Sequence, residues 1–383
     1  MNILYVCGHD PHDQSFGGAQ RTHLLWKALQ EVGEVYTVCY YPHEGKISER
    51  IVAIDIKNPT GKRSWVNRGI RRIWDLFDRE GKKILPVPAT FSIETPFPDI
   101  HFDAVVCRYC EPASLFHLWK IAPLYIDVDD HPIQAFETRD SLLLKKWQRP
   151  IAALLQKLEF HLIERHTTGG WIANPDQVSQ LRFKKKAIAL KNVSSTPSKK
   201  YISNVNRRNY LFSVGFMQYQ PNYLGIHRFL TEVWPVVYEK HPELKYYIVG
   251  KNAPSDYVKQ WEDMNGVEYL GFVDNLEELY QYSLATVVAV DQGSGTCIKT
   301  LESMSFSRIC LARPFGIRGL ESEAYNGKNG LHVYHNSAEF LSLLDKVVLD
   351  ESERNLQEQR AKQFIEQNYS FELFKESVKQ AFL

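Results

Sequence analysis

Two charged side chains, Lys299 and Glu302, follow a glycine-rich turn at 293–295. A spacing of three residues places both on the same face of a helix. A lysine in that position can bind phosphate, and a carboxylate can accept hydrogen bonds from hydroxyl groups. This chemistry favours a diphosphate held by Lys299 and a ribose or sugar held by Glu302. An ordinary strand, turn and helix with a surface Lys–Glu pair would explain the same residues.

The elements around this pair must supply a strand and a helix N-terminus. The apolar run 284–290 is rich in β-branched residues, which is typical of a buried parallel strand. Gly293 and Gly295 permit a tight turn, and Thr296 is expected to cap the helix that follows. The free amides of its first turn and the helix dipole favour an anion at that point.

The chain opens with a similar unit. An apolar strand at 2–7 and a loop ending in Gly17-Gly18 precede a helix that ends near Gly33. The dinucleotide fingerprint GxGxxG is absent, so the two glycines more plausibly let the backbone approach a ligand closely. Arg21 falls in the first helical turn, where it faces either that loop or solvent.

A cluster of charged residues follows the strand predicted at 124–128. Charged groups at the carboxyl end of a parallel strand are typical of a binding site. Asp130 and His131 could orient a sugar or serve acid–base chemistry. Capping of a helix by Asp130 is the alternative. No second acidic cluster accompanies them in the sequence, so no metal is expected.

Composition limits the class of protein. A chain of 383 residues exceeds one hydrophobic core, and its net charge of +1 argues against a nucleic-acid partner. Six cysteines in this length fit a reducing cytoplasm, and Cys107 and Cys110 lack the second pair that zinc would need. They are expected to be small buried residues. The first residues do not read as a signal peptide, and no apolar run approaches the ~20 residues of a membrane span.

The segment 62–83 is basic and interleaved with aromatic residues. Val66, Ile70, Ile73 and Phe77 would share one helix face. Such a helix could dock peripherally on an anionic membrane at its cytoplasmic face. A core-facing helix with a solvated basic side is the alternative.

Alternating strands and helices in both halves predict an α/β protein with two parallel sheets. In the second half, predicted strands at 211–214, 246–249 and 267–270 end in Gly215, Gly250 and Gly271. We expect domains at 1–195 and 209–368, joined by a polar linker at 196–208. Their interface is the expected ligand site.

The second half resembles the donor-binding domain of GT-B glycosyltransferases, above all glycosyltransferase family 4 (glycosyl transferases group 1). Four blocks carry this resemblance: SVGFMQYQPN at 213–222, YIVG at 247–250, VEYLGFV at 267–273 and GSGTCIKTLESM at 293–304, which continues into RICLARPFGIRGL at 308–320. The first half is similar through the Gly17-Gly18 loop with Arg21 and the strand end at 190–192.

The resemblance implies two Rossmann-like domains facing across a cleft, with a last helix, 369–383, packing back on the first domain. It implies a nucleotide-diphosphate sugar donor and transfer, with retention, to a hydroxyl of a glycan or lipid-linked acceptor. Such chemistry belongs to surface polysaccharide or glycoconjugate synthesis, and it needs no metal or other cofactor.

Site residues carry over by position in this resemblance. Glu302 would bind the ribose hydroxyls, while Gly17 and Gly18 would close over the phosphate from the other domain. Asp130 and His131 would lie near the reacting groups, and Gly215 and Gly250 near the donor. The remaining donor contacts would be Gly271, Phe272 and Val273 at the base, and Ser294, Gly295, Thr296, Cys297 and Lys299 at the diphosphate and sugar.

Three positions depart from the pattern of many members. Ser294 stands where a glutamate is common, and Phe216 and Asn222 stand where an arginine and a lysine are common. A related branch carries an arginine where this chain has Cys297. Fewer cations would then meet the diphosphate, unless Arg21, Lys299 or Arg313 compensates. A catalytically degenerate binding or scaffold protein, and a nucleotide-sugar epimerase of the same fold, are the rival hypotheses.

Overall fold

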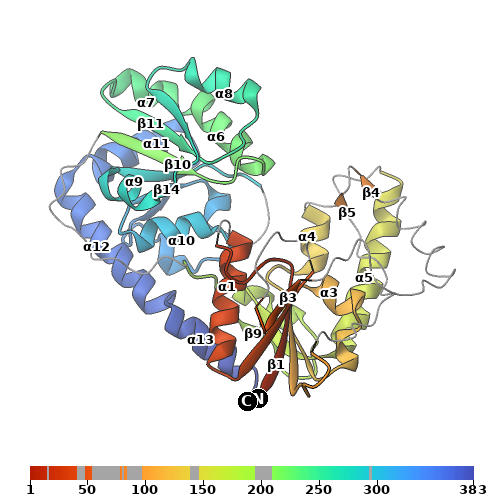
Figure 1. The fold of residues 1–383 in the computed structure, drawn as a ribbon. Helices are drawn as coiled ribbons and strands as arrows, with labels where there is room; N and C mark the ends of the chain where they lie inside the picture. The colour runs from red at the N-terminus through yellow and green to blue at the C-terminus, as the bar shows by residue number, and fades with distance from the viewer. Residues whose placement is uncertain are drawn as a thin grey trace. The chain divides into compact units, whose positions relative to one another are not determined.

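The computed structural model describes residues 1–14, 17–40, 48–53, 97–138, 146–194, 209–292 and 296–383, and the backbone of 78–79 and 82–83. The chain forms two compact units (Figure 1). The first unit comprises Met1–Asn192 and Phe371–Leu383, and the second comprises Val193–Ser370. The expected linker at 196–208 lies outside the described residues.

The first unit contains a parallel sheet with strand order β3-β2-β1-β6-β7-β8-β9. Its centre is formed by apolar runs that are buried on both faces, as expected of parallel strands flanked by helices. The strands are β1 (Asn2–Cys7), β2 (Glu34–Cys39), β3 (Ile51–Ala53), β6 (Ala104–Arg108), β7 (Leu124–Asp127), β8 (Thr167–Ile172) and β9 (Ile188–Ala189).

Helices pack against this sheet. Helix α1 buries Leu24, Leu25, Ala28 and Leu29 and contacts β1, β2 and α13. Pro150 lies in the first turn of α5, where its missing N–H costs no helical hydrogen bond. Pro150 is therefore compatible with the start of this helix. The helices are α1 (Gly17–Gln30), α3 (Cys110–Leu115), η1 (Leu118–Lys120), α4 (Pro132–Thr138), α5 (Gln148–His166), η3 (Pro175–Gln180) and α13 (Phe371–Gln380).

The second unit has its own parallel sheet with strand order β12-β11-β10-β13-β14-β15. The order reverses direction between β10 and β13, which is where ligands bind in sheets of this type. The strands are β10 (Tyr210–Val214), β11 (Lys245–Val249), β12 (Val267–Gly271), β13 (Ala285–Val288), β14 (Cys310–Ala312) and β15 (Leu331–Val333).

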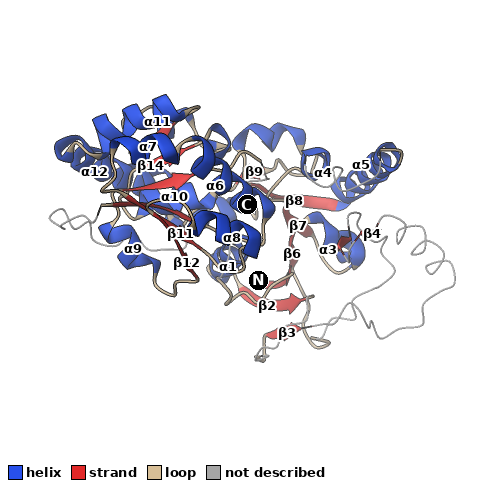
Figure 2. Ribbon diagram, turned by 90° about the horizontal axis from the view of Figure 1, so that it is seen from above, coloured by secondary structure: helices blue, strands red, loops and turns tan. Residues whose placement is uncertain are grey.

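Helices cover this second sheet as well (Figure 2). The helical segment 220–240 is interrupted at Val233, because Pro235 has no backbone N–H to donate within a continuous helix. Trp234 and Trp261 are fully buried in its core. The helices are α6 (Gln220–Glu232), α7 (Trp234–Lys240), α8 (Ser255–Glu262), α9 (Leu276–Tyr282), α10 (Ile298–Ser305), η4 (Pro314–Ile317), η5 (Ser322–Tyr325), α11 (Ser337–Leu343), η6 (Leu344–Val348) and α12 (Glu351–Asn368).

The described part of the basic segment 62–83 is a short antiparallel pair, β4 (Asp78–Arg79) with β5 (Lys82–Lys83). Residues 62–77, which include the predicted helix face, and residues 80–81 lie outside the described residues, so the predicted membrane contact stays a prediction. Within the described chain, no helix combines the length and the apolar character needed to cross a membrane. The prediction of two parallel α/β sheets is confirmed.

Candidate functional site

Three glycines bring the carboxyl ends of β10, β11 and β12 close together. The amide of Gly215 donates to Val249 O at 3.0 Å, and the amide of Gly250 donates to Gly271 O at 2.7 Å. A Cβ on Gly250, whose φ is 144°, would lie 1.8 Å from Gly215 O. A side chain at Gly250 is thus excluded by both space and backbone conformation. We call Gly215, Gly250 and Gly271, which meet at this edge of the sheet, the glycine platform.

Lys299 lies beside this platform. Its Nζ donates to Asn222 Oδ1 at 2.5 Å, and Asn222 Nδ2 donates to Phe216 O at 2.8 Å. A Cβ added to Gly215 would lie 3.4 Å from the lysine Nζ. Burial lowers the pKa of Lys299, while Cys297 and Glu302 partly oppose that shift. An anion at this point would favour the charged form.

Glu302 lies one turn further along α10 and has a partner of its own. Tyr280 donates its hydroxyl to Glu302 Oε2 at 3.2 Å. Tyr280 is fully buried and stacks on Phe306 at 4.3 Å between ring centroids. Burial raises the pKa of Glu302, and both Tyr280 and Lys299 lower it. The carboxylate is therefore held in one orientation by a rigid aromatic group.

The N-terminus of α10 differs from the expectation. The helix begins at Ile298 with Cys297 as the N-cap residue, so Thr296 lies outside the capping position. The Cys297 side chain makes no capping hydrogen bond among the described residues. The Thr300 amide donates to Cys297 O at 3.1 Å, so the first-turn amides that an external acceptor could bind are those of residues 298 and 299. Gly293, Ser294 and Gly295 lie outside the described residues, so their assigned contacts stay predictions.

The guanidinium group of Arg313 is engaged by hydrogen bonds within the second unit. Asp291 Oδ1 accepts from its Nε at 2.9 Å, and its Nη1 donates to His335 O at 2.5 Å. The other oxygen of Asp291 accepts from Arg228 Nη1 at 2.9 Å. Arg313 therefore ties the ends of β13, β14 and β15 together.

The residues expected to border a base include an exposed ring. Phe272 is 64% exposed, and Lys251 Nζ lies 5.5 Å from its centroid. Gly271 has a φ of 66°, which directs the chain out of β12, and an added Cβ would contact nothing within 4 Å. Val273 packs on the buried cluster around Phe212 and Tyr280. The ring of Phe272 is placed to stack on a planar ligand.

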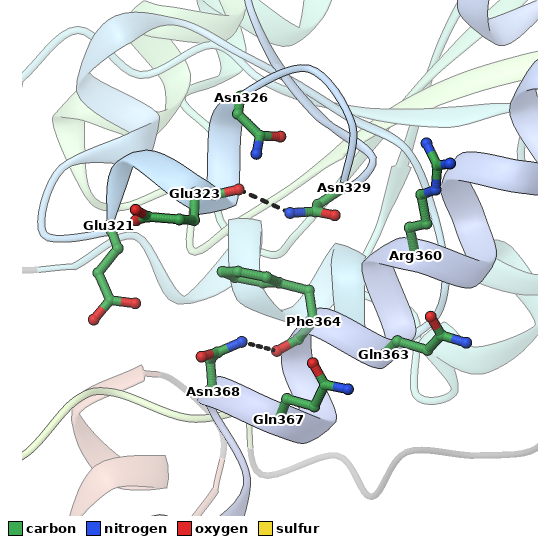
Figure 3. A pocket seen from close by; sticks show the side chains of 9 residues that line it. All are labelled: Glu321, Glu323, Asn326, Asn329, Arg360, Gln363, Phe364, Gln367 and Asn368. Carbon is green, nitrogen blue, oxygen red and sulfur yellow. Dashed lines mark hydrogen bonds between the residues drawn. The ribbon is translucent and has the colours of Figure 1, made fainter.

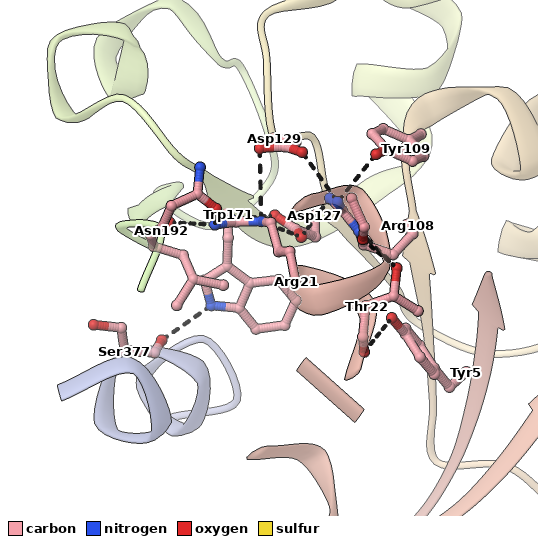
Figure 4. A network of polar contacts seen from close by, with 12 residues as sticks. Tyr5, Arg21, Thr22, Arg108, Tyr109, Asp127, Asp129, Trp171, Asn192 and Ser377 are labelled. Carbon is pink, nitrogen blue, oxygen red and sulfur yellow. Dashed lines mark hydrogen bonds and ion pairs between the residues drawn. The ribbon is translucent and has the colours of Figure 1, made fainter. Parts of the chain in front are cut away.

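In the first unit, Arg21 points into a buried ion-pair network (Figure 4). Its Nε and Nη2 donate to the two oxygens of Asp127 at 2.9 and 2.7 Å. Its Nη1 donates to Leu190 O at 2.9 Å and to Asn192 Oδ1 at 2.7 Å. Arg21 is 2% exposed, so the solvated alternative is wrong. Gly17 and Gly18 form the start of the same helix.

Arg108 completes this network and was missed by the sequence reasoning. It is fully buried and donates to Asp127 Oδ2 at 2.8 Å, to Asp129 Oδ2 at 3.0 Å and to the Tyr109 hydroxyl at 3.1 Å. Burial raises the pKa of Asp129, but Arg108 and Arg21 lower it below the ordinary value. An arginine at the end of an otherwise apolar strand was the available signal.

Two members of this network have a left-handed backbone. Tyr109 has a φ of 69° and Asp129 a φ of 61°, and neither is a glycine. They follow β6 and β7, which are adjacent in the sheet, and Arg108 hydrogen-bonds to both side chains. Strain of this kind is often concentrated at functional sites.

His131 lies next to the network but is turned inward. It is 7% exposed and meets the Phe160 ring edge-on at 5.1 Å. Burial lowers its pKa, and its Nδ1 has no hydrogen-bond partner among the described residues. The His131 carbonyl accepts from Ala135 N at 2.9 Å, the bond expected of an N-cap residue. His131 therefore occupies the N-cap position of α4 through its backbone carbonyl.

The described residues hold no group of three or more His, Cys, Asp or Glu placed to bind a metal. Cys107 and Cys110 are buried, as expected, and burial raises the pKa of both thiols. Figure 3 shows a polar pocket of about 630 Å³ that contains none of the predicted site residues. It is lined by Glu321, Glu323, Asn326, Asn329, Arg360, Gln363, Phe364, Gln367 and Asn368.

Comparison with known proteins agrees with this architecture. Residues 208–350 match the family model for glycosyl transferases group 1. No curated protein matches the chain in sequence.

Solved structures match it along almost its whole length. Sucrose-phosphate synthase from Thermosynechococcus elongatus has a TM-score of 0.67 at 11% identity, covering 100% of this chain and 98% of that one. A variant of TarM from S. aureus, solved with fondaparinux, alpha-GlcNAc-glycerol and UDP, has a TM-score of 0.65 at 11% identity, covering 100% of both chains. HepE from Anabaena, solved with UDP and glucose, has a TM-score of 0.62 at 12% identity, covering 99% of this chain and 98% of that one. At these identities the matches show a shared fold.

Proposed function

We propose that this chain, which has a GT-B fold and matches the family model for glycosyl transferases group 1 over residues 208–350, transfers a sugar from a nucleotide-diphosphate donor to an acceptor hydroxyl. We further propose retention at the anomeric carbon, a glycan or lipid-linked acceptor, and a role in surface polysaccharide or glycoconjugate synthesis. The reaction would use no resident metal or other cofactor, and it would take place in the cytoplasm.

One observation carries the donor assignment: Lys299 stands in the first turn of α10, where the Cys297 side chain makes no capping bond among the described residues, and its Nζ lies beside Gly215 at the end of β10. Helix amides and an ammonium together favour a diphosphate. As the bond to the sugar breaks, negative charge develops on the departing nucleotide diphosphate. Fixed amides and Lys299 would stabilise that charge, which is the usual means by which enzymes lower such a barrier.

The neighbouring side chains would orient the rest of the donor. Glu302, aligned by Tyr280, is suited to accept hydrogen bonds from the two ribose hydroxyls. The exposed ring of Phe272 would stack on the base. UDP and glucose accompany HepE, and UDP accompanies the TarM variant, so UDP-sugars are the first donors to test.

For the acceptor we propose the turn formed by Asp129, Asp130 and His131. Arg108 and Arg21 keep Asp129 ionised, and its side chain is 18% exposed. A carboxylate held in this way can accept a hydrogen bond from a hydroxyl group. Burial lowers the pKa of His131, and because its ring is turned inward it would have to rotate before it could accept a proton from the acceptor.

A thermal-shift screen of the full chain against a panel of nucleotide sugars tests the proposal. A bound donor raises the melting temperature by mass action. We expect one UDP-sugar to raise it, and Glu302→Ala to abolish that rise and the associated turnover. Full turnover by Glu302→Ala would remove the central assignment.

A binding protein on the same fold is the second candidate. The neutral Asn222 at a position where many relatives carry a lysine, and the engagement of Arg313 by Asp291, favour it. Donor binding without transfer to any acceptor, or no binding of nucleotides at all, would support this candidate over the enzyme.

A further inference from the structure

The outward face of α5 carries a line of large apolar side chains. They are Trp147, which precedes the helix, and Ile151, Leu154, Leu158 and Leu162, each between 45% and 62% exposed. Successive spacings of four, three, four and four residues place them on one face of the helix. We call these five residues the α5 stripe. The opposite face buries Ala152, Phe160 and Ile163, and the helix contacts α3 and α4.

A stripe of this length needs an explanation. Single exposed apolar residues are normal, but a contiguous row of them on a soluble domain usually marks an interaction surface. The inner face of α5 already anchors the helix, so these five residues are not needed to hold it in place.

The exposed charged side chains in the segment that carries the stripe are all basic. In 146–166, which the structure describes completely, the exposed charged residues are Lys146, Lys157 and Arg165, with His161 between them. The two glutamates of the helix are not exposed. Glu164 is 6% exposed and accepts from Arg182 N at 2.8 Å, and Glu159 has a buried oxygen. The exposed surface of 146–166 is therefore apolar and basic.

We propose that the α5 stripe docks on an anionic lipid surface. An interfacial helix places its apolar face about 5–10 Å into the boundary between headgroups and acyl chains, with basic residues meeting the lipid phosphates. Trp147 at one end is a side chain that favours this boundary. The inference goes beyond sugar transfer and does not depend on it, because it uses no residue of the donor site.

The charges argue against a second copy of the chain as the occupant. In a symmetric dimer built on the stripe, Lys157 and Arg165 of each copy would face the basic residues of the other. Like charges that face each other at an interface repel and oppose association. An anionic membrane removes that repulsion.

Flotation of the full chain with lipid vesicles tests the proposal. We expect it to float with phosphatidylcholine vesicles containing about 30% phosphatidylglycerol, to stay behind with pure phosphatidylcholine, and to bind less as salt rises from about 0.1 to 0.5 M. Failure to float with the anionic vesicles would overturn the proposal, whatever the donor screen shows.

Two variants locate the surface. Leu154→Ser/Leu158→Ser should bind anionic vesicles at least about tenfold more weakly, because two leucines that would be buried in the lipid are lost. Lys157→Glu/Arg165→Glu should do the same and remove the salt dependence. The matched control, Leu356→Ser on α12, changes a leucine that is 41% exposed and should bind as the unmodified chain does.

Other results would contradict the assignment to lipid. A dimer in light scattering that Leu154→Ser/Leu158→Ser converts to a monomer would show that a second copy covers the stripe. Unchanged vesicle binding by that variant would place the membrane contact elsewhere.

Discussion

Lys299 and Asn222 join two helices of the second unit through one hydrogen bond of 2.5 Å between Nζ and Oδ1. Lys299 belongs to the first turn of α10 and Asn222 to the first turn of α6. This hydrogen bond holds the ammonium group near the end of β10. Because the Asn222 amide is neutral, it orients the ammonium group without neutralising its charge. It explains how a chain with an asparagine in this position can still present a cation.

Replacing this cation should weaken donor binding. Lys299→Met removes a charge-assisted hydrogen bond worth about 1.5–3 kcal/mol, so we expect the dissociation constant of the UDP-sugar to rise about 10- to 100-fold. Calorimetric titration measures this directly. The control Lys259→Met alters an exposed lysine of α8 and should leave the affinity unchanged. An unchanged affinity in Lys299→Met would contradict the diphosphate site.

Glu159 should make stability depend on pH. Burial is the main cause that raises its pKa from 4.5 to about 7, and a hydrogen bond from Ser114 partly opposes it. Because the folded pKa lies above the unfolded one, the protonated form favours folding, and this contribution is lost as pH rises from about 4.5 to about 7. The free energy of unfolding of Glu159→Gln should therefore be about 1–3 kcal/mol higher than that of the unmodified chain at pH ~8. This difference should shrink toward pH ~5.

Urea unfolding at several pH values checks this sign. Glu137→Gln, at an exposed glutamate of α4, serves as the control. A gap that stayed constant with pH would show that ionisation of Glu159 is not its cause.

The carboxylate of Asp127 should be essential to the first unit. It accepts hydrogen bonds from both Arg21 and Arg108, so Asp127→Asn leaves two buried guanidinium groups with only Asp129 as a counter-charge. We expect a loss of about 3–5 kcal/mol in the free energy of unfolding. Asp103→Asn, at an exposed residue that accepts from Asn2 N, should cost under about 1 kcal/mol. Equal losses in the two variants would argue against the network.

Two glycines of the platform should respond differently to alanine. Gly250→Ala would force a Cβ to 1.8 Å from Gly215 O, so it should destabilise by more than about 3 kcal/mol and abolish donor binding. Gly271→Ala meets no atom within 4 Å and should cost only about 1–2 kcal/mol, because a positive φ is strained for alanine. Thermal unfolding of both variants, followed by the donor screen, measures the difference.

Three strands of the second unit could be predicted because each of their apolar runs ends in a glycine. Gly215, Gly250 and Gly271 close three adjacent strands, and a parallel sheet must place such ends at one edge. The local sequence pattern gave a wrong prediction where the surroundings of a residue decide whether it caps a helix. Thr296 is a good capping residue by type, but α10 starts two residues later, at Ile298.

The amino-acid sequence by itself determined the two parallel sheets, their glycine-ended strands and the position of Lys299 and Glu302 on one helix face, because these follow from periodicity along the chain. Only the tertiary structure decided which charged side chains pair with one another. Arg108 and Asp127 are 19 residues apart in the chain and 2.8 Å apart in space, and Arg21 reaches the same carboxylate from α1. In α5, apolar residues line both faces, so the sequence could not say which would remain exposed. Burial and pairing depend on distant segments, and no local pattern encodes them.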